Sequence, residues 1–298
     1  MQTSLVRAFL ALHLMSIFLF ALTMFSAILF RSVKRCPMWY SFCASWLMFS
    51  ASFSLLAFAG QQFSLTQSKN LCIAQAGLVY AAPFLAGCAS AALVIKLLSN
   101  ILDTVSPNLT RPNRTSLVGT ILGLAVPWGV WLGVLIGVLI FSVTKQGNVS
   151  LSPNATFCVV QSSPVPRLTS VFTIILAVVV LSLELVIATF LIRHRSLKDL
   201  LSQSKAVAVR VFLFTGVVLT AAVTGLAFAM TDRRGGAFDV LMAMTPFCTA
   251  LIFGSQSDLW KGYVQWLPAS CLAKRTHHEV APSHQETISI RQGTIVIS

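Results

Sequence analysis

Seven long apolar runs restrict what this chain can fold into. They cover residues 8–30, 37–60, 71–98, 116–143, 169–192, 207–230 and 237–254. A helix needs about 20 mostly apolar residues to cross the roughly 30 Å of hydrocarbon in a bilayer. The runs are continuous and lack the short alternating pattern of membrane strands. We therefore expect an all-α membrane protein, built as a seven-transmembrane helix bundle.

The amino-acid composition agrees with a chain that lies in a membrane. Of the 298 residues, 56% are hydrophobic and only 10% are charged, whereas a soluble domain carries about a quarter charged residues. The first run follows Arg7 and is longer than the roughly 7–15-residue apolar core of a cleavable signal peptide. We expect it to be retained as the first span.

The distribution of basic residues predicts the orientation of the chain. If the N-terminus lies outside the cell, 15 of the 21 Lys and Arg residues fall in inner segments and 6 in outer segments. The positive-inside rule therefore favours an outer N-terminus and a cytoplasmic C-terminus, and we expect the plasma membrane as the location. The net charge of +13 then indicates attraction to anionic inner-leaflet lipids rather than a nucleic-acid partner.

Two cysteines lie on the outer side in this orientation. Cys72 is at the mouth of the third span, and Cys158 is in the loop between the fourth and fifth spans. The oxidising exterior permits a disulfide between them. Because a sequence does not give the distance between two Cα atoms, a pair of free thiols is the alternative.

The same outer loop contains two acceptor patterns for N-glycosylation. They begin at Asn148 and Asn154, and we expect both to carry glycans. Asn108 and Asn113 begin equally good patterns in the loop between the third and fourth spans. A single span separates the two loops, so both pairs cannot lie outside, and the distribution of charge favours Asn148 and Asn154.

Seven spans, an outer N-terminus, the two outer cysteines and the FGSQSDLW exit from the last span resemble the G-protein-coupled receptors. The chain looks most similar to the orphan receptors of fungi, which are loosely related to the cyclic-AMP-receptor-like branch. Rhodopsin-class motifs are missing, since LVIKLLSN stands where Glu/Asp-Arg-Tyr would end the third helix. The resemblance implies an unknown extracellular ligand and a heterotrimeric G protein on the cytoplasmic face.

Basic residues on the inner side are candidates for the G-protein-facing surface. They are Lys96, Arg193, Arg195, Lys198, Lys205 and Arg210. Alternatively, these side chains only anchor the chain to the inner leaflet.

The segment after the seventh run predicts a short interfacial eighth helix. Ser257 and Asp258 are good N-cap residues, and aromatic and aliphatic residues follow at three- and four-residue steps. The alternative is a seventh span that continues into a frayed end. We expect a transmembrane domain over residues 1–267 and a disordered cytoplasmic tail over 268–298. Cys271 is a candidate for palmitoylation.

Three residues within the spans are candidates for ligand binding or switching: Tyr80, Glu184 and Asp239. Ionisable side chains are costly in a bilayer and are therefore candidates for a function. Glu184 fits either a hydrogen bond to a neighbouring helix or a role in switching. Asp239 fits either a surface pairing with Arg233 and Arg234 or contact with a cationic ligand group.

Catalytic patterns are missing from the sequence. It contains no His-Glu-x-x-His, no nucleophile elbow and no phosphate-binding glycine loop. We therefore expect no enzymatic activity, no cofactor and no metal site. The alternative function is a multi-span transporter of a small solute, although the odd number of spans and the lack of an inverted half-repeat disfavour it.

Overall fold

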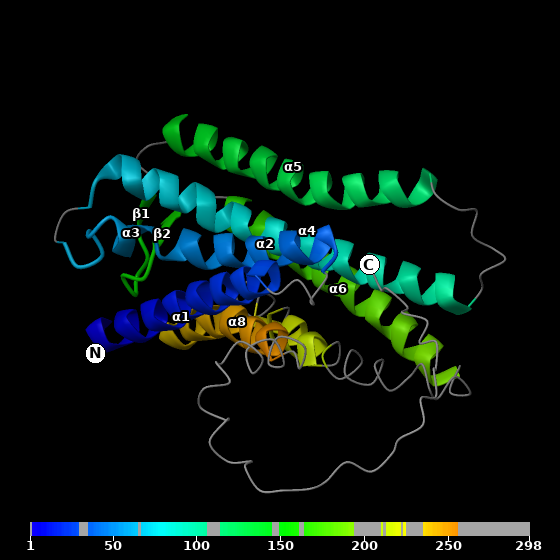
Figure 1. Ribbon diagram of the computed structural model, residues 1–298. Helices are drawn as coiled ribbons and strands as arrows, with labels where there is room; N and C mark the ends of the chain where they lie inside the picture. Colours follow the sequence, from blue (N-terminus) through cyan, green and yellow to red (C-terminus); the bar gives the residue numbers. More distant parts are fainter. Residues whose placement is uncertain are drawn as a thin grey trace, which may run out of the picture.

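The computed structural model describes residues 2–29, 35–64, 67–105, 114–144, 149–160, 164–193, 210, 213–221, 223–224 and 235–255. Long helices lie side by side and form one bundle (Figure 1). In chain order, the elements are α1 (Gln2–Leu29), α2 (Pro37–Phe53), α3 (Leu55–Phe58), α4 (Lys69–Val105), α5 (Arg114–Thr144), β1 (Val149–Leu151), β2 (Cys158–Val160), α6 (Pro164–Arg193) and α8 (Gly236–Gly254).

Five of the described helices are long and apolar enough to cross a membrane. These spans are Thr3–Leu29, Lys69–Leu102, Leu117–Thr144, Val165–Phe190 and Gly236–Gly254. They coincide with the first, third, fourth, fifth and seventh of the predicted apolar runs. The expectation of a helical membrane-embedded protein is therefore confirmed.

The second predicted run is broken into two helices, where the sequence predicts one. Helix α2 ends at Phe53, Ser54 leaves the helical conformation with φ −93° and ψ 4°, and α3 continues over four residues. The end of α2 leaves backbone carbonyls without partners in the helix. The side-chain amide of Gln75 on α4 donates to two of them, the carbonyl oxygens of Phe53 at 3.1 Å and Ser52 at 3.4 Å. The break is thus stabilised by a neighbouring helix.

Helix α4 is the centre of the bundle and packs against α2, α5 and α6. Small residues make this close packing feasible, because they let neighbouring backbones approach. A Cβ atom placed on Gly87 would lie 2.7 Å from Cδ1 of Leu176 on α6, and one on Gly77 would lie 3.0 Å from Cδ2 of Leu139 on α5. Larger residues at these positions would push the helices apart.

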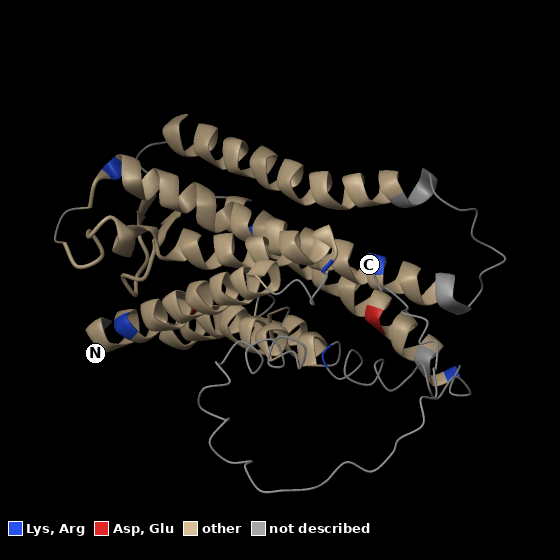
Figure 2. Cartoon of the chain, viewed as in Figure 1, with Lys and Arg blue, Asp and Glu red and all other residues tan. Residues whose placement is uncertain are grey.

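The outward faces of the helices are apolar, and charged side chains are few. Leu117 on α5 and Leu185 on α6 are 66% and 68% exposed, and similar side chains cover the outer face of α1. Long stretches of the helices carry no charge (Figure 2). Exposed apolar surface of this extent is typical of a protein that lies in lipid.

Candidate functional site

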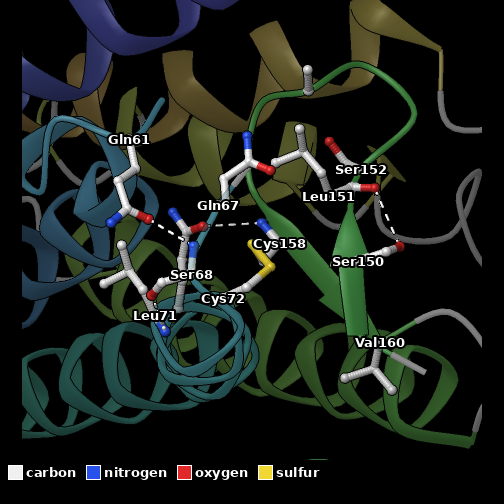
Figure 3. The surroundings of a disulfide bond; sticks show 12 residues. Gln61, Gln67, Ser68, Leu71, Cys72, Ser150, Leu151, Ser152, Cys158 and Val160 are labelled. Atoms are coloured by element: carbon white, nitrogen blue, oxygen red, sulfur yellow. Dashed lines mark hydrogen bonds between the residues drawn. A yellow bond between two sulfur atoms is a disulfide. The ribbon is translucent and has the colours of Figure 1, made fainter. Parts of the chain in front are cut away.

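A two-stranded hairpin covers one end of the helix bundle, which we call the hairpin end. Strands β1 and β2 are antiparallel, with Val149 opposite Val160 and Leu151 opposite Cys158. A disulfide joins Cys158 of β2 to Cys72 in the first turn of α4, with a Cα–Cα distance of 5.3 Å (Figure 3). The predicted pairing of these two cysteines is therefore confirmed.

Gln75 provides a second link between α4 and the hairpin. It lies one turn after Cys72 and is fully buried. Its Oε1 accepts a hydrogen bond of 3.0 Å from the backbone N–H of Cys158, while its Nε2 donates to the carbonyls at the end of α2. One side chain thus satisfies buried backbone groups of two separate elements, which would otherwise be costly to bury.

Gln62, in the segment between α3 and α4, holds the turn of the hairpin. Its Nε2 donates to the carbonyl oxygens of Ala155 at 2.9 Å and Thr156 at 3.2 Å. Ala155 has a left-handed backbone with φ 56°, a conformation that is costly for a residue other than glycine. The bonds from Gln62 help to hold the turn in this shape.

Asp239 joins the hairpin to α8. Its side chain is 1% exposed, and its Oδ2 accepts hydrogen bonds from Thr156 Oγ1 at 2.8 Å and Asn154 Nδ2 at 2.9 Å. The structure therefore gives this carboxylate a role that the sequence does not indicate. Arg233 and Arg234, its expected partners, lie outside the described residues.

The same contact bears on the glycosylation prediction. The amide nitrogen of Asn154, to which a glycan would be attached, donates to Asp239 in this structure. The hydroxyl of Thr156, the third residue of the acceptor pattern, is fully buried. Asn148 lies outside the described residues. Glycosylation at both positions stays a prediction.

A cavity of about 160 Å³ lies beneath the hairpin. Its wall is formed by α2, α4, α6, the helical residues 213–221, α8 and the hairpin. Representative lining side chains are Trp46, Tyr80, Phe157, Val180, Val218 and Met242. Because Phe157 belongs to the hairpin, the links described above also position one wall of the cavity.

The lining of the cavity is apolar apart from a few hydroxyl groups. No charged side chain belongs to it in the described part of the chain. The hydroxyls of Ser90, Thr169, Ser170, Thr173 and Thr245 each donate to a carbonyl of their own helix, at 2.6 to 3.1 Å. These hydroxyls therefore have no free proton to donate to a ligand, and their oxygens can only accept hydrogen bonds.

Tyr80 is the predicted ligand residue that lines the cavity. Its side chain is 7% exposed, and its hydroxyl oxygen accepts a hydrogen bond of 3.4 Å from the backbone N–H of Val160. A tyrosine hydroxyl is both a donor and an acceptor. Its proton has no acceptor among the described residues.

Glu184 lies one turn beyond Val180 on α6 and does not line the cavity. It is buried, and its Oε2 accepts a hydrogen bond from the hydroxyl of Thr215. The carboxylate therefore links α6 to the helical residues 213–221. Of the two roles that the sequence left open, the structure supplies the hydrogen bond to a neighbouring helix.

The basic residues predicted to face a G protein are only partly described. Arg193 is exposed at the last residue of α6, and Lys96 and Arg210 are half-buried. The predictions that lie outside the described residues are Arg195, Lys198, Lys205, the eighth helix with Ser257 and Asp258, Cys271 and the tail.

Beneath the hairpin, aromatic rings from three elements meet around His13 of α1. His13 is fully buried and stacks on Phe53, with 5.0 Å between ring centroids and 5° between ring planes. Phe9 contacts the edge of His13 at 4.5 Å and stacks on Phe157 at 6.0 Å. This cluster supports Phe53 and Phe157 from behind the cavity wall.

A scan of the sequence against models of protein families finds no match, and a search of curated proteins finds no significant match either. The case for a function therefore depends on the geometry of this end of the bundle.

Proposed function

We propose that this protein is a seven-transmembrane receptor that binds an extracellular ligand in the cavity and activates a heterotrimeric G protein on the cytoplasmic face. The observation that carries the proposal is an apolar cavity between helices, covered on one side by a hairpin that a disulfide ties to the central helix. A cavity lined by several helices allows a ligand to favour one arrangement of those helices over another, which is the requirement for a shift in population.

The path of the chain supports two further crossings beside the five long apolar helices. Helix α8 begins at the hairpin end, where Asp239 contacts the hairpin, whereas α6 ends at the opposite end. These positions support a connection that crosses the membrane once between α6 and α8. Residues 213–221 are helical, with Phe214 near Phe253 at the end of α8 and Val218 at the cavity.

The second crossing is formed by α2 together with α3. Helix α2 has 17 residues and would span about 26 Å at 1.5 Å per residue, slightly less than the hydrocarbon thickness. The four residues of α3 extend it toward the hairpin end. The seven-span bundle that we propose consists of these two crossings and the five long helices.

The proposed orientation places the hairpin end outside the cell. The disulfide needs an oxidising compartment, and α1 begins at this end, since Leu5 lies against Gly236 at the start of α8. With the distribution of basic residues, this supports an outer N-terminus, a cytoplasmic C-terminus, contact with anionic inner-leaflet lipids and a plasma-membrane location. The interfacial eighth helix remains part of the proposal.

The proposal is tested by nucleotide exchange on a panel of purified Gα subunits, with the full chain reconstituted in lipid vesicles. We expect the protein to accelerate exchange of GDP for GTP on at least one subunit and to conduct no solute across the vesicle membrane. Solute flux driven by an ion gradient, with no exchange on any subunit, would instead support the transporter.

A pair of variants separates a cytoplasmic G-protein contact from a general effect of charge. Arg193 is exposed at the end of α6, and Arg7 is exposed on α1 at the hairpin end. Arg193→Ala should lower the rate of exchange, whereas Arg7→Ala should leave it unchanged. Equal effects of the two substitutions would contradict the proposed G-protein-facing surface.

A further inference from the structure

We infer that the cavity takes an uncharged, compact and largely apolar molecule that carries one hydrogen-bond acceptor directed at Tyr80. This inference rests on the proposed function for the identity of the ligand site, and it adds the chemical class of the ligand.

The volume of the cavity limits the size of the ligand. It measures about 160 Å³, close to the roughly 150 Å³ of an engineered apolar cavity that binds benzene. A single six-membered ring with a small substituent therefore fits within this volume, and a larger ligand would have to extend through the open side of the cavity.

The described part of the wall offers no partner for a charge on the ligand. The described lining residues include no Asp, Glu, Lys, Arg or His, and the five serine and threonine hydroxyls already donate to backbone carbonyls. A carboxylate would find no cation and an ammonium group no carboxylate. Burying an ion without a partner is far more costly than burying a neutral polar group.

Tyr80 supplies the polar contact. Its hydroxyl oxygen already accepts a hydrogen bond from the backbone N–H of Val160. The hydroxyl can still donate its own proton. That proton has no acceptor in the described part of the chain. A ligand carbonyl or ether oxygen would satisfy it, and an acceptor is therefore the polar group that this cavity recognises best.

The test uses two neutral probes of nearly the same shape, the ketone 4′-fluoroacetophenone and the alkene 4-fluoro-α-methylstyrene. The ketone has a carbonyl oxygen where the alkene has a methylene group. Binding to the full chain in lipid nanodiscs is measured by ¹⁹F NMR, with empty nanodiscs to subtract partition into lipid. We expect the ketone to bind more tightly than the alkene. 4-Fluorobenzoate and 4-fluorophenethylammonium, which are charged, should not bind.

Tyr80→Phe removes the hydroxyl and keeps the ring. We expect it to weaken binding of the ketone about 2- to 10-fold, the range that a single neutral hydrogen bond contributes, and to leave binding of the alkene unchanged. The alkene thereby controls for any change in the shape of the cavity. An equal loss for both probes would overturn the role of Tyr80.

A second pair of variants locates the binding site. Thr173 lines the cavity, whereas Val171, two residues earlier on α6, is 50% exposed on the outward face. Thr173→Phe should abolish binding of both neutral probes, and Val171→Phe should leave it unchanged. Specific binding of either charged probe, no specific binding of the neutral probes, or binding that survives Thr173→Phe would overturn the inference. Because this experiment measures binding and not nucleotide exchange, its failure is distinguishable from a failure of the receptor proposal.

Discussion

The two ends of the helix bundle are held by different kinds of interaction. At the hairpin end, a disulfide and the side chains of Gln75, Gln62 and Asp239 fix the hairpin to three neighbouring elements. At the opposite end, aromatic rings pack together, with 4.6 Å between the ring centroids of Phe42 and Phe253. The hydrogen bond from Thr215 to Glu184 also joins helices in this half of the bundle, and rings also pack around His13 beneath the hairpin, so the ends differ in how densely they are cross-linked. Hydrogen bonds and disulfides have strict geometry, whereas ring packing has several arrangements of similar energy.

This difference indicates which end can rearrange. Phe214, from the helical residues 213–221, contacts both Phe42 and Phe253, at 5.8 and 5.7 Å between centroids. Movement of those residues relative to α2 and α8 would therefore exchange one set of ring contacts for another. The hairpin end would keep its shape, which is the division of roles expected of a receptor whose helices shift on the cytoplasmic side.

Loss of the disulfide should lower the free energy of unfolding more than any other change at the hairpin end. The bridge closes a loop with a sequence separation of 86 residues, and the loop-entropy relation gives about 4.6 kcal/mol for such a closure. Cys72→Ala and Cys158→Ala should each lower the free energy of unfolding by that amount, measured by thermal unfolding in detergent. The double variant should resemble either single one, and additive losses would mean that the two cysteines act separately.

Phe42→Ala should have the next largest effect, and at the opposite end. Phe42 is fully buried, and removing such a ring leaves a cavity that costs about 3 to 5 kcal/mol. Hydrogen exchange should accelerate near the end of α8 and in the helical residues 213–221, which Phe42 contacts, but not in the hairpin. Phe18→Ala is the matched control, because Phe18 is 60% exposed on α1. Faster exchange in the hairpin of the Phe42 variant would mean that the two ends are coupled.

Asp239→Ala should loosen the hairpin end alone. It removes the acceptor of two hydrogen bonds and leaves Thr156 and Asn154 without that partner. We expect a loss of about 2 to 3 kcal/mol and faster hydrogen exchange over residues 149–160. Asp239→Asn keeps one oxygen acceptor and should recover part of the loss. An unchanged hairpin in the alanine variant would contradict the role given to Asp239.

Gln75→Leu should have the smallest effect of the four, about 1 to 2 kcal/mol. The substitution conserves most of the volume but leaves the N–H of Cys158 and the carbonyls at the end of α2 unpaired. Gln75→Glu loses the donor and adds a buried carboxylate beside the carbonyls at the end of α2, so it should be no more stable than the leucine variant in thermal unfolding. No loss in the leucine variant would show that solvent satisfies these groups.

Much of the fold could be predicted from the sequence because the apolar runs are long and separate. Five of the runs form long apolar helices, and Cys72 and Cys158 form a disulfide as predicted. The break of α2 at Ser54 could not be predicted, because the side chain that stabilises it, Gln75, lies on another helix. A serine-rich segment was the only local indication of it.

The site was harder to predict, since it depends on contacts between distant parts of the chain. Asp239 stood out as an acid within an apolar run, but its partners Asn154 and Thr156 come from a loop more than 80 residues away. The roles of Gln62 and Gln75 could not be predicted, because a neutral glutamine belongs to no sequence motif that indicates its partner. The cavity is formed by side chains from several elements, and hydropathy alone does not distinguish a cavity wall from a packed core.

The length of α4 determines how far its free end moves when the helix tilts at its attachment to the hairpin. The helix has 37 residues, so it extends about 55 Å, well beyond the thickness of the hydrocarbon layer. It is fixed near one end by the disulfide and packs against α2, α5 and α6 along its length, so it can move only together with them. In the proposed receptor, a tilt of this helix by about 5° about the disulfide would displace its other end by about 5 Å, so a small adjustment around a ligand would become a larger displacement at the opposite surface.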